Sequence, residues 1–112
     1  MNLFTPAKIA ALLADMKAEN TAAYDLRRIP SIADYVLITE GVSPPHIRAM
    51  AEKLYRSMKT SGLSPKYDGR SSAFPDWAVI DSGRCVVHIM LAEKRDFYAL
   101  DRLFDNGRKM KC

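Results

Sequence analysis

Cys85, His88 and Asp81 are the residues whose chemistry could make this chain an enzyme. An imidazole beside a carboxylate suits proton transfer near neutral pH, and a thiol beside an imidazole can act as a nucleophile. However, Cys85 and His88 are three positions apart in a predicted β-strand, so their side chains point to opposite faces of the sheet. We therefore interpret Cys85 as a small buried hydrophobic residue, and His88 as a structural histidine or a contact for a partner.

Motifs that bind nucleotides or metals are absent from the sequence. There is no G-x-x-x-x-G-K-[ST] loop, no G-x-G-x-x-G, and no C-x-x-C, H-E-x-x-H or D-x-D. Asp25, Asp34 and Asp81 could hold a magnesium ion only if the fold brought them together, because their spacing matches no known site. We predict no catalytic, cofactor or metal site, and a nucleotide-using transferase is kept as an alternative.

The stretch from Asp76 to Leu91, DWAVIDSGRCVVHIML, must position these residues. Its two runs of β-branched residues flank Ser82 and Gly83, which is typical of a β-hairpin. Both faces of the second strand are apolar, so the second face must be covered by a helix or by another molecule. Trp77, the only tryptophan, opens the hairpin at the sheet margin and is either a core residue or a binding anchor.

Hydrophobic periodicity and cap residues predict the remaining elements. Thr5 with Pro6, and Ser43 with Pro44, are typical helix starts. In chain order we expect a helix over 6–19, a short strand over 22–26, a buried strand over 34–39, a helix over 44–61, a weak strand over 63–68, the hairpin, and a last helix whose buried side carries Phe97, Leu100 and Phe104. This order predicts one α/β domain over residues 1–112, with about three helices and a mixed sheet of four to five strands.

The net charge of +4 is concentrated at the end of the chain. Residues 108, 109 and 111 account for three of the 17 basic residues, which leaves 14 against 13 acidic ones. We expect a flexible basic tail over about 105–112. A small RNA-binding domain that uses this tail and the basic residues between Arg48 and Lys59 is a second alternative.

Two cysteines make no disulfide framework, and no segment resembles a signal peptide or a membrane span. We expect a soluble protein of the cytoplasm.

Four segments together resemble the ribosomal silencing factor family, also called iojap-like. They are SIADYVLITEG (31–41), HIRAMAEKL (46–54), DWAVIDSGRCVVHIML (76–91) and RDFYALDRLF (95–104). The resemblance implies a fold related to nucleotidyltransferases but without their catalytic carboxylates. It also implies binding to the large ribosomal subunit through ribosomal protein L-fourteen, which would block joining of the small subunit and repress translation. Some family members assist large-subunit assembly instead.

By position, the resemblance maps family residues onto Trp77, Asp81, Gly83, His88, Arg95, Tyr98 and Leu100. The partner-binding set that we expect is Trp77, Val79, Asp81, Gly83, Arg84, His88, Met90, Arg95 and Tyr98. Two positions depart from the family, which commonly has an aromatic or aliphatic residue at position 82 and an acid at position 84. Arg84 reverses that charge, which bears on docking because L-fourteen is itself basic. An apolar surface with an aromatic anchor could also pair two copies of the free protein, and a weak contact with ribosomal RNA is a further expectation.

Overall fold

The computed structural model describes residues 4–29, 33–71, 75–104 and 107–110. Side chains are described throughout these ranges except at positions 98, 100, 103 and 108. In chain order the elements are α1 (Pro6–Asp15), β1 (Glu19–Asp25), β2 (Tyr35–Glu40), α2 (Pro44–Thr60), β3 (Lys66–Asp68), β4 (Trp77–Asp81), β5 (Cys85–Met90), α3 (Ala92–Tyr98), the 3-10 helix η1 (Leu100–Phe104) and β6 (Arg108–Met110).

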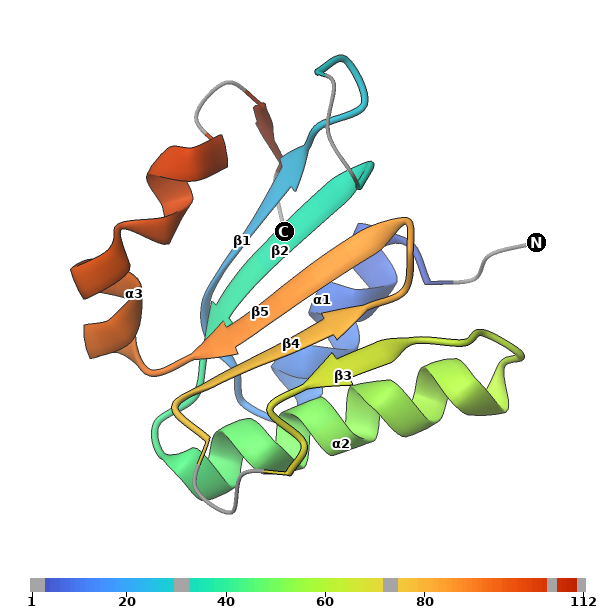
Figure 1. The fold of residues 1–112 in the computed structure, drawn as a ribbon, viewed down its shortest axis with the longest axis vertical. Helices are drawn as coiled ribbons and strands as arrows, with labels where there is room; N and C mark the ends of the chain where they lie inside the picture. Colours follow the sequence, from blue (N-terminus) through green and yellow to red (C-terminus); the bar gives the residue numbers. More distant parts are fainter. Residues whose placement is uncertain (1–3, 30–32, 72–74, 105–106, 111–112) are drawn as a thin grey trace.

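The strands form one mixed sheet in the order β3-β4-β5-β2-β1-β6 (Figure 1). The central pair, β2 and β5, is parallel, with Tyr35 opposite Cys85 and Glu40 opposite Met90. All other neighbouring strands are antiparallel. The mixed α/β sheet is therefore confirmed, and so is the hairpin, which is formed by β4 and β5.

Side-chain caps start the two long helices where the sequence predicts. The hydroxyl of Thr5 accepts a hydrogen bond from the backbone of Lys8 at 3.2 Å, and the hydroxyl of Ser43 accepts one from the backbone of His46 at 3.3 Å. Helix α1 ends at Asp15, four residues before the predicted end, because Lys17 has a φ of 66° and turns the chain toward β1. The first strand consequently begins at Glu19.

Helices α1 and α2 lie on the same face of the sheet (Figure 1). Ile9 and Leu13 of α1 and the apolar stripe of α2 are buried against inward residues of β2 and β5 such as Leu37 and Val87. Cys85 belongs to this cluster, as predicted, with 1% of its surface exposed. This face forms the main hydrophobic core.

The C-terminal quarter differs from expectation. The predicted last helix is interrupted at Ala99, which has a left-handed conformation (φ 48°, ψ 45°), and η1 follows it. Because of this break, Phe97 and Phe104 no longer lie on one face of a continuous helix. Phe97, predicted to be buried, is 79% exposed. Arg108–Met110 pairs with β1 as β6, whereas a flexible tail was expected. This strand raises the count to six.

None of the helices in the described ranges is long and apolar enough to cross a membrane.

Candidate partner-binding surface

The second face of the sheet is only partly covered. Helix α3 and η1 lie over its β1 and β2 side, where Phe104 stacks on Tyr24 with ring centroids 5.8 Å apart. Over β4 and β5 the outward side chains are only half-buried; they are Trp77, Val79, Val86 and His88, here called the open patch. The apolar second face seen in the sequence is thus covered by a helix at one end and accessible at the other.

Trp77 and His88 form a fixed pair within the open patch. The indole N–H of Trp77 donates a hydrogen bond to Nδ1 of His88 at 3.0 Å, and the two ring centroids are 5.9 Å apart. Because the indole nitrogen can only donate, Nδ1 must be unprotonated, which leaves the proton of the neutral ring on Nε2. Burial lowers the pKa of His88 below its ordinary value, since the charged imidazolium would lose hydration. The histidine orients the tryptophan and stays neutral.

The turn of the hairpin is built around Gly83. Ser82 N–H donates to the carbonyl of Cys85 at 2.9 Å, and the carboxylate of Asp81 accepts from Gly83 N–H at 2.7 Å. Gly83 has a φ of 91°, which only glycine adopts without strain. Positive φ at the first central residue alone is the pattern of a II′ turn, which suits the twist of a hairpin. Asp81 therefore has a structural role at this end of the patch.

Arg84 has its charge balanced within the chain. Its Nε lies 3.2 Å from a carboxylate oxygen of Asp34, and its guanidinium lies 5.7 Å from the ring centroid of Tyr35. About half of each side chain of the ion pair is exposed. The positive charge of Arg84 is therefore partly neutralised by Asp34.

Arg95 and Met90 of the predicted set are placed inside the protein. Arg95 donates to both carboxylate oxygens of Asp101 at 2.9 Å and to Glu40 at 3.0 Å. Only 12% of the Arg95 side chain is exposed, and Met90 is fully buried. These residues hold α3 and η1 against the sheet and support the open patch from beside it. Tyr98, the last of the set, has a side chain outside the described ones.

The remaining members of this network join residues that are far apart in the sequence. Glu40, 9% exposed, accepts at its other oxygen from the amide of Asn20 at 3.0 Å, and Asp101 accepts from the hydroxyl of Tyr24 at 2.6 Å. The hydrogen bonds from Arg95 and Tyr24 lower the pKa of Asp101 to about 2. A glutamate at the end of an apolar strand was the only available signal, since a buried acid needs a partner.

The residues considered for catalysis are separated or already occupied. Cys85 faces the α1 and α2 side, whereas His88 lies on the opposite face. Burial raises the pKa of the Cys85 thiol to about 11, so the nucleophilic thiolate is disfavoured. His46 accepts from Val42 N–H at 3.0 Å and contacts the carbonyl of Met16 at 2.7 Å, which is a structural role.

The acids proposed for magnesium binding also have other partners. Asp25 pairs with Arg27 at 2.7 Å, Asp34 with Arg84, and Asp81 with the backbone of Gly83. Among the described residues, no group of three or more His, Cys, Asp or Glu side chains is arranged to hold a metal ion. The transferase alternative thus gains no support from the geometry.

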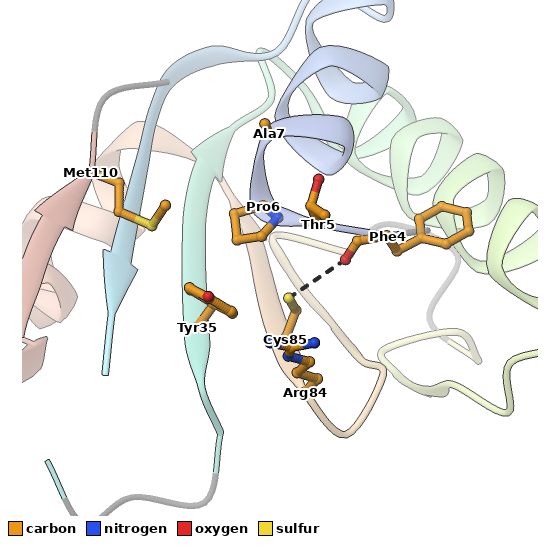
Figure 2. A pocket seen from close by; sticks show the side chains of 8 residues that line it. All are labelled: Phe4, Thr5, Pro6, Ala7, Tyr35, Arg84, Cys85 and Met110. Carbon is orange, nitrogen blue, oxygen red and sulfur yellow. Dashed lines mark hydrogen bonds between the residues drawn. The ribbon is translucent and has the colours of Figure 1, made fainter. Parts of the chain in front are cut away.

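A cavity of about 260 Å³ lies at the end of the sheet where α1 begins. Figure 2 shows the Cys85 thiol directed at the carbonyl of Phe4, 3.8 Å away, with Pro6, Tyr35 and Met110 forming much of the wall. Among the described residues that line it, Arg84 is the one with a charged side chain, and it is paired with Asp34. The polar groups that would orient a small ligand are few here.

Known proteins are similar to this chain over nearly its whole length. The family model described as "Ribosomal silencing factor during starvation" matches residues 5–112. Ribosomal silencing factor RsfS of Zymomonas mobilis is 34% identical over 110 residues, which cover 93% of this chain and 80% of that protein. Mitochondrial assembly of ribosomal large subunit protein 1 of Mus musculus is 31% identical over 103 residues, or 86% of this chain and 44% of that protein.

A crystal structure from Bacillus halodurans superposes with a TM-score of 0.80 at 27% identity and covers 96% of both chains. Family model, relatives and fold agree over nearly the whole sequence. The chain belongs to the ribosomal silencing factor family.

Proposed function

We propose that this protein binds the large ribosomal subunit in the cytoplasm through ribosomal protein L-fourteen, with the open patch as its docking surface. Bound there, it sterically prevents the small subunit from joining. The observation that carries the proposal is Trp77, which is half-buried at the margin of the uncovered sheet and is held in one orientation by His88. A pre-oriented aromatic side chain binds at low entropic cost and is a frequent hot spot of protein interfaces.

The surroundings of Trp77 also suit an interface. Val79 and Val86 supply apolar surface beside it, and Asp76 with Lys94, 3.5 Å apart, supplies a charged rim. Apolar centres with polar rims are typical of specific protein interfaces. The choice of L-fourteen as the partner rests on the family resemblance.

The central experiment compares two variants in cosedimentation with isolated large subunits. Trp77→Ala removes the anchor and should weaken binding by about 2 kcal/mol or more. Val42→Ala is the matched control, because Val42 is also apolar and 67% exposed but lies in the loop between β2 and α2. It should bind like wild type. Wild-type protein that binds neither large subunits nor purified L-fourteen would sink the proposal.

The blocking step is tested by adding small subunits to large subunits and following joining by light scattering. Wild type and Val42→Ala should suppress joining, and Trp77→Ala should do so only at higher concentration. Undiminished joining on large subunits saturated with wild-type protein would contradict steric blocking while leaving docking intact.

Reversing the charge of Arg84 tests whether this residue contacts a basic partner. Arg84→Glu introduces the kind of residue that relatives commonly have there, and it should strengthen binding to basic L-fourteen at low salt. Because Arg84 is about half exposed, the gain should disappear as salt screens the charge. Equal binding by wild type and variant at all salt concentrations would place Arg84 outside the contact.

The open patch also supports self-association of the free protein. If two copies pair through it, sedimentation equilibrium should show a dimer for wild type and a monomer for Trp77→Ala, and L-fourteen should dissociate the dimer. A dimer that survives Trp77→Ala would place the pairing surface elsewhere.

A further inference from the structure

A groove of about 420 Å³ runs between α1 and α2, on the helical face of the molecule. One stripe of α2, at positions 53, 56, 57 and 60, faces α1, since these positions follow helical spacing. Positions 8 and 12 of α1, one turn apart, form the other side. Figure 1 shows both helices on the side of the sheet opposite α3, so the groove lies away from the open patch.

The groove collects positive charge without acidic side chains. Lys8, Lys53 and Arg56 line it, and its described lining residues include no Asp or Glu. Neither lysine forms an ion pair within the described part of the chain, and Arg56 is 76% exposed with only a 3.6 Å contact to Glu52. Glu52 is instead closer to Arg70, at 3.2 Å, on the flank of α2 that faces away from α1. Lys8 Nζ lies over the ring of Phe4, 5.2 Å from its centroid. The three cations, from two helices, are thus at most weakly paired with acids in the described part of the chain.

Hydroxyl groups accompany these cations. Ser57, Thr60 and Ser61 line the same groove near the end of α2. Lysine and arginine together with serine and threonine hydroxyls are the side chains that most often contact phosphate oxygens of nucleic acids. An exposed groove with this combination is suited to several phosphates.

We infer that the groove between α1 and α2 binds the phosphate backbone of RNA. A free nucleotide is a poorer fit, since Phe4, the one aromatic residue among the described ones that line the groove, is 2% exposed and offers no open face for a base. The groove chemistry identifies a ligand with several phosphates, and the choice of RNA rests on the proposed function, which brings the chain to an RNA-rich particle. Because the groove and the open patch lie on opposite faces, RNA and L-fourteen can be bound together.

Two basic residues of α2, Lys53 and Arg56, face the groove, whereas Lys59 lies over the ring of Tyr55 on the other flank. Arg70, from the loop after β3, lies over the same ring. Lys109, in the segment expected to form a basic tail, belongs to β6 beside β1. The inferred RNA site is therefore narrower than the basic helix and tail considered from the sequence.

Fluorescence anisotropy with a labelled fragment of large-subunit RNA tests the inference. The groove triple variant Lys8→Gln/Lys53→Gln/Arg56→Gln is compared with the control triple Arg28→Gln/Arg102→Gln/Lys109→Gln. Both remove three exposed positive charges, but the control charges lie on the loop after β1, on η1 and on β6. Thermal unfolding should be close to wild type for both, because surface substitutions of this kind have small effects.

The groove triple should bind RNA about tenfold more weakly or worse at moderate salt, and the slope of log K against log salt should be lower by about 2 to 3. The control should remain within about twofold of wild type. Equal losses in the two triples would overturn the inference, since net charge alone would then explain binding. No RNA binding by wild type at low salt would overturn it as well.

Binding of the same variants to purified L-fourteen distinguishes a failure of this inference from a failure of the proposed function. The groove triple should bind L-fourteen as wild type does, whereas Trp77→Ala should lose L-fourteen and keep RNA. Loss of RNA binding by Trp77→Ala would assign the RNA contact to the open patch and so overturn the groove. Anionic vesicles that bind wild type through these three cations while RNA does not would also overturn it.

Discussion

The indole nitrogen of Trp77 on β4 donates a hydrogen bond to Nδ1 of His88 on β5, 3.0 Å away across the hairpin. The two residues are diagonal neighbours, because Val79 is directly opposite His88 and Trp77 is opposite Met90. One bond therefore links the aromatic anchor of the open patch to the protonation state of a histidine.

The burial of His88 makes the free energy of unfolding depend on pH. The pKa of folded His88 is lowered by burial from 6.5, so the unfolded chain takes up the proton first as pH falls. The contribution of neutral His88 to the free energy of unfolding is complete above 6.5 and is lost as pH falls from there to the lower folded pKa. Chemical denaturation at several pH values across this window should show wild type losing more stability than His88→Gln.

Glutamine keeps an acceptor for Trp77 but has no titrating group, so it isolates the proton effect. Parallel curves for wild type and His88→Gln would contradict a lowered pKa. Below the window, docking through Trp77 should weaken in wild type only, because the imidazolium has no lone pair to accept the indole proton.

Arg95 is predicted to stabilise the fold and not to contact the partner directly. Arg95→Met leaves Glu40, with 11% of its side chain exposed, without its cation and should cost about 3 kcal/mol in the free energy of unfolding. Adding Glu40→Gln removes the unpaired charge and should recover part of the loss. Arg102→Met, an exposed arginine on η1, is the matched control and should be near neutral. Urea denaturation of wild type and these three variants checks this; a double variant that is less stable than Arg95→Met would contradict it.

The pairing of Asp101 predicts acid sensitivity. Its pKa is lowered from 3.8 to about 2 by hydrogen bonds from Arg95 and Tyr24, so its contribution is present above 3.8 and is lost as pH falls toward 2. Wild type should therefore lose more stability over this interval than Asp101→Asn. Thermal unfolding at acidic pH measures the difference, and equal losses would show that another carboxylate dominates.

Gly83→Ala tests the turn of the hairpin. A Cβ at this position would meet no atom within 4 Å, so its cost comes from the φ of 91° alone. We expect a loss of about 1 to 2 kcal/mol, and a smaller one for Gly83→Asn because asparagine tolerates left-handed backbone better. Thermal denaturation of both variants measures it. Equal losses for the two would point to a steric origin.

The sequence predicts best the elements whose signals are local. Helix α2 has a cap at Ser43, an apolar stripe and Gly62 after its end, and the hairpin has β-branched runs around Gly83. The exposure of Phe97 could not be predicted, because it depends on the left-handed turn at Ala99. Strand β6 was missed because two charged residues followed by one apolar residue carry no strand pattern, and they form a strand only through pairing with β1.

Part of the candidate site can likewise be predicted from local sequence patterns, and part of it cannot. Trp77, Val79 and His88 share a face because strand alternation places them there, and the sequence shows that alternation. Arg95 was assigned to the partner surface, yet its contact with Glu40 joins residues 55 positions apart, which no local pattern reveals.

The parallel pairing of β2 with β5 has a consequence for how the chain folds. Tyr35 and Cys85 meet across this pair although 50 residues separate them, and α2, β3 and β4 lie between. Closing so long a loop is slow compared with forming a helix or a hairpin. We therefore expect α2 and the β4–β5 hairpin to form early. The pairing of β2 with β5 should form late, in the rate-limiting step.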